Sequence, residues 1–361
     1  MVCKLGITSM SLGRCYAGHS FVAKLDAAQK YGYQGIELFH EDLADVAKGG
    51  DESMSSSGPS QKAQLAAARE ISRLCKDRGI EIICLQPFSQ YDGLVDRNEH
   101  QERLKQLTFW FNLARQLGTD IIQIPANFLP ADKVTDDFTV IVSDLREVAD
   151  MGLAMNPPIR FAYESLCWST RIDTWELCWG IVQLVDRPNF GMCLDTFNIA
   201  GRIYADPLKY SGKTVNAEEA VRDSIAEMVR IVDVNKVFYV QVVDAERLDK
   251  PLLPGHPFYN ADQPARMTWS RNCRLFYGEQ DRGAYLPVAQ IARAFFHDLG
   301  FEGWVSLELF NRRMADTGAD VPEELARRGA ISWAKLQKDM GLAVEAKPDP
   351  KPDVNRVFAS L

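Results

Sequence analysis

Short apolar runs alternate with longer segments of helical period along almost the whole chain. The apolar runs are rich in Val, Ile, Leu and aromatic residues. Two of them, I-E-I-I-C-L-Q and D-I-I-Q-I-P-A, are almost continuously apolar, as strands covered on both faces are. Eight strands are predicted, at 3–9, 35–39, 80–86, 120–125, 160–165, 190–196, 237–243 and 303–309.

Helical patterns fill the intervals between these runs. The segment after Asp96 places apolar residues on one face and stops at Gly118, a typical helix end. Asp173, followed by Glu176, resembles an N-cap with an acidic residue in the first turn. No sequence repeat accompanies the alternation, so its period is that of a β-α unit and not of a solenoid.

Eight β-α units in a chain of 361 residues predict a (β/α)8 barrel, an α/β fold of the TIM-barrel type, as one domain over 1–342. A doubly wound sheet is the alternative, but no Gly-x-Gly-x-x-Gly follows the first predicted strand. A long insertion is predicted at 244–284, after the seventh strand. The Ser/Gly-rich segment 47–60 is predicted to be a mobile loop, and 343–361 an extended C-terminal tail.

Charge and composition exclude several classes of protein. The net charge of −8 disfavours nucleic acid as a partner, and no apolar run reaches the roughly 20 residues of a membrane span. No basic and apolar leader is visible at the N-terminus, and the eight cysteines contain no C-x-x-C pair. These features predict a cytoplasmic protein with reduced cysteines and no membrane partner.

Four consecutive predicted strands each end in an oxygen-bearing side chain: Glu164, Asp195, Gln241 and Glu308. In barrels of this kind the catalytic groups lie at the carboxyl ends of the strands. Three converging carboxylates repel one another and need a cation, yet the last three strands themselves contain no Lys or Arg. Oxygen ligands, with an amide instead of an imidazole, favour Mg²⁺ or Mn²⁺. The alternative is that each acid is a surface or ion-paired group.

The set Glu, Asp, His or Gln, and Glu on strands five to eight resembles that of the xylose-isomerase-like, sugar-phosphate isomerase/epimerase barrels. A closer resemblance is to the fungal 3-dehydroshikimate dehydratases and covers nearly the whole chain. It is carried by L-G-I-T-S-M-S-L-G, G-I-E-L-F-H-E-D-L, G-M-C-L-D-T-F-N-I-A-G-R, G-H-P-F-Y and Q-P-A-R-M-T-W-S-R-N-C-R-L-F. One position departs from the pattern, because Asn198 stands where many members have His.

The resemblance implies a hydro-lyase that converts 3-dehydroshikimate to protocatechuate and water in quinate and shikimate catabolism. A divalent metal bound by the four strand-end residues would stabilise the dienolate formed when a ring proton is lost. No organic cofactor is implied. The expected partner is a small-molecule carboxylate, with a homo-oligomer possible.

Two further groups of residues are candidates for this reaction. His256, in the segment most specific to the family, is the favoured general base and His40 the second choice; each is otherwise a structural histidine. The anionic substrate calls for a planar cationic fork. The candidate substrate-binding residues are Arg266, Trp269, Ser270, Arg271, Arg274 and Asn198, and the alternative is a surface charge cluster with packing aromatics.

Other functions remain open for such a chain. A metal-dependent ketose isomerase or epimerase on the same barrel is the main alternative, and a non-catalytic binding or scaffold barrel is another. All four expected ligands are present, which argues against the scaffold. A DNA-repair endonuclease would need several His ligands and a basic face, whereas this chain has five His and a net charge of −8.

Overall fold

The computed structural model describes residues 1–49 and 58–344. The Ser/Gly-rich loop predicted at 47–60 falls mostly on residues 50–57, and the tail predicted at 343–361 falls mostly on residues 345–361. Both of these stretches lie outside the described residues.

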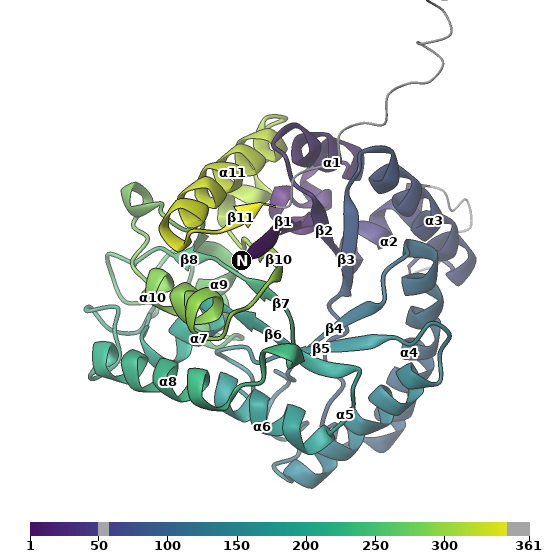
Figure 1. The fold of residues 1–361 in the computed structure, drawn as a ribbon, viewed down its shortest axis with the longest axis horizontal. Helices are drawn as coiled ribbons and strands as arrows, with labels where there is room; N and C mark the ends of the chain where they lie inside the picture. Colours follow the sequence, from purple (N-terminus) through teal and green to yellow (C-terminus); the bar gives the residue numbers. More distant parts are fainter. Residues whose placement is uncertain (50–57, 345–361) are drawn as a thin grey trace, which may run out of the picture.

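Eight parallel strands of the described chain close into a barrel, which confirms the predicted fold (Figure 1). Pairing of the last of these strands with the first, from Cys3 opposite Gly303 to Ile7 opposite Leu307, completes the closure. The strands are β1 Val2–Thr8, β2 Gly35–Phe39, β3 Glu81–Gln86, β4 Ile121–Pro125, β5 Arg160–Glu164, β6 Phe190–Asp195, β7 Val237–Gln241 and β10 Gly303–Leu307.

Helices surround the barrel on the outside (Figure 1). They are α1 Phe21–Lys30, α2 His40–Gly49, α3 Gln61–Asp77, α4 Arg97–Leu117, α5 Phe138–Leu153, α6 Trp175–Val185, α7 Thr196–Ile203, α8 Ala217–Ile231, α9 Ala265–Cys273, α10 Val288–Arg293 and α11 Val321–Met340. Across the two described ranges, no helix combines the length and apolar character that crossing a membrane requires.

The caps explain where two of these helices begin. Asp96 accepts hydrogen bonds from the backbone N–H groups of Asn98 and Glu99, so the predicted start of α4 is confirmed. The predicted cap of α6 at Asp173 is wrong by one residue. Thr174 is in the extended conformation and its hydroxyl accepts the first-turn N–H, while the Asp173 carboxylate forms an ion pair with Arg202.

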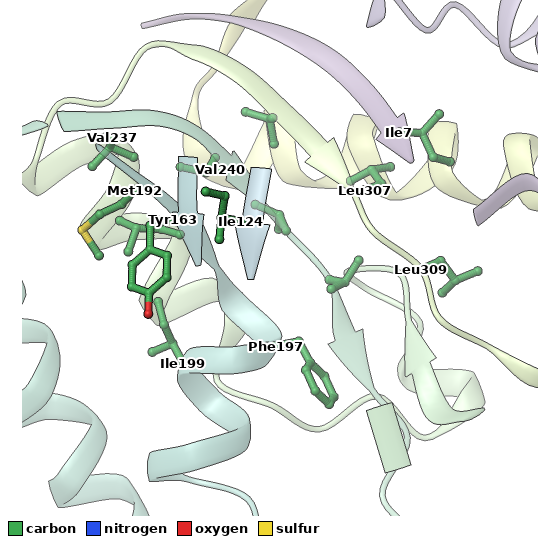
Figure 2. Close-up of a cluster of buried hydrophobic side chains, with 14 of the residues drawn as sticks. Ile7, Ile124, Tyr163, Met192, Phe197, Ile199, Val237, Val240, Leu307 and Leu309 are labelled. Carbon is green, nitrogen blue, oxygen red and sulfur yellow. The ribbon is translucent and has the colours of Figure 1, made fainter. Parts of the chain in front are cut away.

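Buried apolar side chains fill the space between the strands and the surrounding helices (Figure 2). Tyr163 from β5, Met192 from β6 and Val237 from β7 contribute to this core. Because parallel strands covered on both faces cannot shift register without exposing this surface, the core fixes where each strand ends. The strand ends carry the candidate site.

The segment after β7 turns back over the carboxyl end of the barrel. Asp244–Ala245 (β8) and Arg274–Leu275 (β9) form a short antiparallel pair, and α9 lies directly before β9. Near the other end of the described chain, β11 (Ala343–Val344) pairs with the start of β1, so the sheet continues two residues past the predicted boundary at 342.

A buried ion pair joins α1 to α2. Lys24 Nζ lies 2.6 Å from Asp42 Oδ1, and both side chains are almost fully buried. Substitution Lys24→Met should lower the free energy of unfolding by about 3–5 kcal/mol, because it leaves the Asp42 carboxylate buried without its cation. Urea unfolding measures this loss. The double variant Lys24→Met/Asp42→Leu should be clearly more stable than the single variant, and equal stability would contradict the explanation.

Candidate active site

Three carboxylates meet at the carboxyl end of the barrel. Glu164 ends β5, Asp195 ends β6 and Glu308 directly follows β10. All three are buried, and each offers an oxygen within 4.8 Å of the others. The last residues of neighbouring parallel strands lie at one edge of the sheet, which brings these acids together from distant parts of the sequence. They are called the carboxylate cluster below.

Gln241 ends β7 and lies directly across the sheet from Asp195. Its side chain is fully buried. The Nε2 group donates to both carboxylate oxygens of Glu37, at 3.1 and 3.0 Å. The Oε1 atom has no hydrogen-bond partner among the described residues. A buried amide oxygen without a donor is costly, so its position beside the carboxylate cluster indicates a ligand.

Burial and mutual repulsion disfavour the charged forms of the cluster. Burial raises the pKa of Glu164 well above its usual range, and the charges of Glu308 and Asp195 raise it further. Burial also raises the pKa of Asp195, and it raises that of Glu308 to about 8, although Arg274 opposes both shifts. The protein groups alone therefore supply too little positive charge to keep three buried carboxylates ionised.

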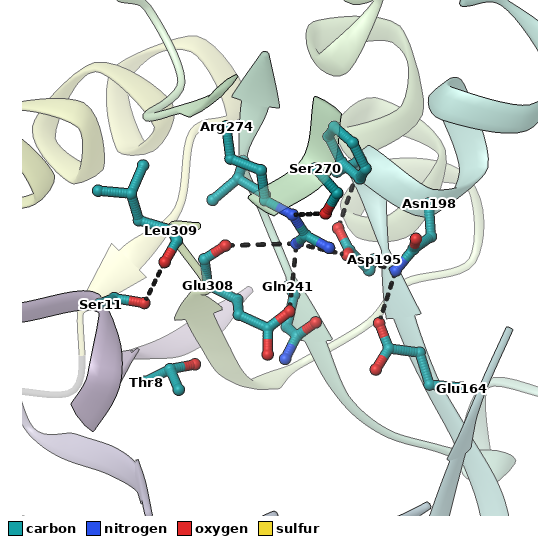
Figure 3. Close-up of polar contacts among 12 residues, drawn as sticks. Thr8, Ser11, Glu164, Asp195, Asn198, Gln241, Ser270, Arg274, Glu308 and Leu309 are labelled. Atoms are coloured by element: carbon teal, nitrogen blue, oxygen red, sulfur yellow. Dashed lines mark hydrogen bonds and ion pairs between the residues drawn. The ribbon is translucent and has the colours of Figure 1, made fainter. Parts of the chain in front are cut away.

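One cation does reach the cluster from the segment after β7. Arg274 Nη1 lies 2.8 Å from Asp195 Oδ2 and 3.1 Å from Glu308 Oε2, and its Nε donates to Ser270 Oγ at 3.0 Å (Figure 3). The strands β6, β7 and β10 contain no basic residue, but the long connection after β7 supplies one. A single guanidinium balances one of three negative charges, and a divalent cation would balance the other two.

The cluster fits a divalent metal of the hard type. Its donors are three carboxylates and the unpartnered amide oxygen of Gln241. This set consists of oxygen atoms alone, which suits Mg²⁺ or Mn²⁺ better than nitrogen- or sulfur-seeking ions. Three buried carboxylates and one unpartnered amide oxygen thus form a donor set that could hold such an ion.

A cavity of about 120 Å³ opens above the cluster, and is called the mouth cavity below. Polar groups at its base and apolar groups on its walls make it suitable for a small polar ring compound. Its lining residues are Phe39, Gln86, Pro87, Ser89, Gln123, Pro125, Phe128, Glu164, Leu166, Trp168, Ser270, Arg271, Arg274, Glu308 and Phe310.

Arg271 and Trp168 line this cavity with donors that have no partner in the described part of the chain. Arg271 makes no ion pair or hydrogen bond there. Its side chain lines the cavity but is also exposed to solvent, and partial desolvation together with nearby Arg14 lowers the pKa of its guanidinium. The Nε1 atom of Trp168 is buried without an acceptor. An anionic group in the cavity would satisfy both.

Three predicted substrate-binding residues have other contacts. Asn198 Nδ2 donates to Glu164 Oε1 and Asp195 Oδ2, at 2.8 and 2.7 Å, so it bridges two acids of the cluster (Figure 3). The guanidinium of Arg266 donates to backbone carbonyls of the segment 201–205. Trp269 donates to the carbonyl of Glu246. Neither Arg266 nor Trp269 lines the mouth cavity.

The two histidines predicted as bases lie elsewhere. His40 begins α2 and stacks on Trp110, with ring centroids 4.9 Å apart, and burial lowers its pKa. His256 accepts a hydrogen bond from the backbone N–H of Phe258. Neither residue is part of the lining of the mouth cavity. The role of either histidine as a base therefore stays a prediction of the sequence, which the lining of the cavity does not support.

Three polar residues of the site are absent from the sequence prediction: Glu37, Gln86 and Gln123. Gln86 Nε2 donates to Glu37 Oε2 at 2.8 Å and to Glu308 Oε1 at 3.3 Å. Gln123 Nε2 donates to Glu164. They stand in β2, at the end of β3 and in β4. The strand-end rule points to Gln86 alone, because Glu37 and Gln123 stand in mid-strand, where the signal is a polar residue inside an otherwise apolar run.

Comparisons with known proteins agree with this architecture. A family model described as a xylose isomerase-like TIM barrel matches residues 25–336. The 3-dehydroshikimate dehydratase of Neurospora crassa is 67% identical over 362 residues, which covers 100% of both chains.

Solved structures share the fold at lower identity. A xylose isomerase-like TIM barrel/4-hydroxyphenylpyruvate dioxygenase fusion protein is 24% identical with a TM-score of 0.69, over 94% of this chain and 44% of its own. The IOLI protein, solved with a bound zinc atom, is 18% identical with a TM-score of 0.65, over 93% and 98% of the two chains. The chain thus belongs to the xylose isomerase-like TIM-barrel family and, within it, to the group of the 3-dehydroshikimate dehydratases.

Proposed function

We propose that the chain dehydrates 3-dehydroshikimate to protocatechuate and water. The observation that carries the proposal is the carboxylate cluster with the orphaned Gln241 oxygen, set beneath a small cavity that holds the unpaired cation Arg271. The full-length similarity to the Neurospora crassa enzyme supports this substrate over the ketoses of the alternative hypothesis.

The cavity orients the substrate by charge and shape. Arg271 is the lining cation free to form a two-fold hydrogen-bonded pair with the ring carboxylate, since Arg274 already holds Asp195 and Glu308. Apolar side chains such as Phe128 and Phe310 lie against the faces of the ring. The ketone and hydroxyl oxygens then face the carboxylate cluster.

The reaction breaks a C–H bond at the ring carbon γ to the ketone and then the C–O bond of the β-hydroxyl group. A final proton shift completes the aromatic ring and water leaves. A divalent cation held by Glu164, Asp195, Gln241 and Glu308 would stabilise the negative charge that develops on the ketone oxygen. We propose Mg²⁺ or Mn²⁺ in this role, because all four donors are oxygen atoms.

The proton removed from the ring carbon is returned to the departing hydroxyl group, so that one molecule of water leaves and no proton is left over. A role in quinate and shikimate catabolism, a cytoplasmic location and a homo-oligomeric state stay predictions of the sequence.

The proposal is tested by incubating the purified, Mg²⁺- or Mn²⁺-loaded protein with 3-dehydroshikimate. We expect protocatechuate to accumulate, seen as an ultraviolet-absorbing catechol and identified by chromatography against the authentic compound. Ketose substrates should give no epimer or isomer. Turnover of a ketose with no catechol from 3-dehydroshikimate would establish the alternative activity instead.

Substitution Arg271→Ala should weaken binding of protocatechuate by about ten- to a hundredfold, since a lost charged hydrogen bond is worth roughly 1.5–3 kcal/mol. Isothermal titration measures the affinity. Arg271→Lys should restore only part of it, because an ammonium group cannot form the planar fork. Unchanged affinity in the alanine variant would place the carboxylate at another group.

Substitutions His40→Gln and His256→Gln should leave kcat close to the wild-type value, because neither imidazole lines the mouth cavity. Loss of a general base costs about 100-fold or more in rate. Steady-state assays of both variants distinguish the two cases. A loss of that size in either variant would show that the histidine reaches the substrate.

A further inference from the structure

Glu37 contacts the proposed metal site without belonging to it. It lies in β2 and its side chain is fully buried beside the carboxylate cluster, since Gln86 Nε2 donates both to Glu37 and to Glu308. Donors surround its carboxylate: Gln241 Nε2 reaches both oxygens, Gln86 Nε2 reaches Oε2 at 2.8 Å and Thr8 Oγ1 reaches Oε1 at 3.1 Å. Cys84 Sγ, 3.6 Å from Oε2, is a fourth and weaker donor. A carboxylate held by these four side chains is fixed in place.

The amide of Gln241 faces Glu37 with its N–H end. Burial raises the pKa of Glu37, but the surrounding side-chain donors oppose that shift and favour the ionised carboxylate. An ionised carboxylate accepts hydrogen bonds and donates none, so the amide end that faces it must be the N–H end. The opposite end, Oε1, then points away from Glu37 and lacks a donor among the described residues. The strand register pairs Gln241 with Asp195, and Figure 3 shows Gln241 between Glu308 and Glu164.

We propose that Glu37 is a positioning residue that locks the Gln241 amide with its oxygen toward the carboxylate cluster, ready to bind a divalent cation. The proposal rests on the metal site of the proposed function. A Gln side chain that rotates freely is a poor metal ligand. The oxygen and nitrogen ends of its amide are nearly equal in shape, but only the oxygen binds metal. Glu37 removes that ambiguity, as outer hydrogen-bond partners commonly do for metal ligands.

The test is Mn²⁺ binding to the metal-free protein, measured by titration calorimetry and independently of activity. Glu37→Gln should weaken Mn²⁺ affinity by about 10- to 100-fold, the usual effect of losing an outer-shell partner. Thr8→Val removes a different hydrogen bond to Glu37 and leaves that of Gln241, so it should cost much less. Circular dichroism verifies that each variant is folded.

A double variant that exchanges the residues at positions 37 and 241 separates the effect of amide orientation from an effect on folding. In the double variant Glu37→Gln/Gln241→Glu, the amide at position 37 donates to the carboxylate at position 241. Because both oxygens of that carboxylate are equivalent, one of them faces the cluster whichever way the carboxylate rotates. This variant should bind Mn²⁺ more tightly than Glu37→Gln. Wild-type affinity in folded Glu37→Gln, or a folded swap that binds no Mn²⁺, would overturn the role of Glu37. Failure of the wild-type protein to bind Mn²⁺ would instead contradict the metal site itself.

Discussion

Removal of divalent metal from the purified protein is expected to abolish dehydration of 3-dehydroshikimate, and Mg²⁺ or Mn²⁺ should restore it. Without a cation, two of the three negative charges of the carboxylate cluster are unbalanced. The negative charge that develops on the ketone oxygen of the substrate is then not stabilised by a cation. Glu308→Ala should reproduce the loss, with a rate reduced about 100-fold or more, the scale of removing transition-state charge stabilisation.

The matched control is Glu81→Ala. Glu81 begins β3, at the opposite end of the barrel, and its side chain is exposed. This variant should keep the wild-type rate and bind metal normally. Full activity after exhaustive chelation, verified by elemental analysis, would contradict the metal-dependent mechanism, and a near-normal rate for Glu308→Ala would remove that residue from the site.

Substitution Arg274→Ala should lower kcat/KM about 100-fold or more, since this guanidinium holds two acids of the cluster and lines the mouth cavity. It should also destabilise the metal-free protein by about 3–5 kcal/mol, because Asp195 and Glu308 lose a buried partner. Added Mn²⁺ should then raise the Tm of this variant more than it raises the wild-type Tm, since the cation replaces the lost charge.

Arg266→Ala is the control for this experiment. Arg266 lies in α9, the helix directly before the strand β9 that carries Arg274, but it donates to backbone carbonyls and does not line the mouth cavity. Its loss should affect stability without the extra response to Mn²⁺. If Mn²⁺ raises the Tm of Arg274→Ala no more than that of the wild type, Arg274 and the metal do not neutralise the same carboxylates.

The strands and the strand-end acids could be predicted because both depend on local pattern. The run 80–86 is apolar on both faces, and β3 occupies Glu81–Gln86. Once eight such runs form a barrel, the rule that strand ends meet brings Glu164, Asp195 and Glu308 together. The same rule names Gln86 at the end of β3, but Glu37 and Gln123 lie in the middle of β2 and β4, where a rule about strand ends does not apply.

The position of Arg274 could not be predicted, because the path of the long connection after β7 depends on tertiary packing. Nothing in the sequence around Arg266, Arg271 and Arg274 tells which guanidinium turns inward. The structure assigns three environments: backbone carbonyls for Arg266, the cavity for Arg271 and the carboxylate cluster for Arg274.

The histidines also show that the direction of a side chain cannot be predicted from the local sequence. His40 was selected for its residue type and its place at the end of a strand, yet it begins a helix and stacks on Trp110. Which way a side chain points where a strand becomes a helix is set by the packing of neighbouring helices, and no local pattern reveals it.

The most direct test of this account is an anomalous-scattering map from crystals of the protein loaded with Mn²⁺ and protocatechuate. We predict one strong peak among Glu164, Asp195, Gln241 Oε1 and Glu308, with the ring in the mouth cavity and its carboxylate paired with Arg271. A peak at any other group, or a ring carboxylate bound away from Arg271, would contradict the site described above.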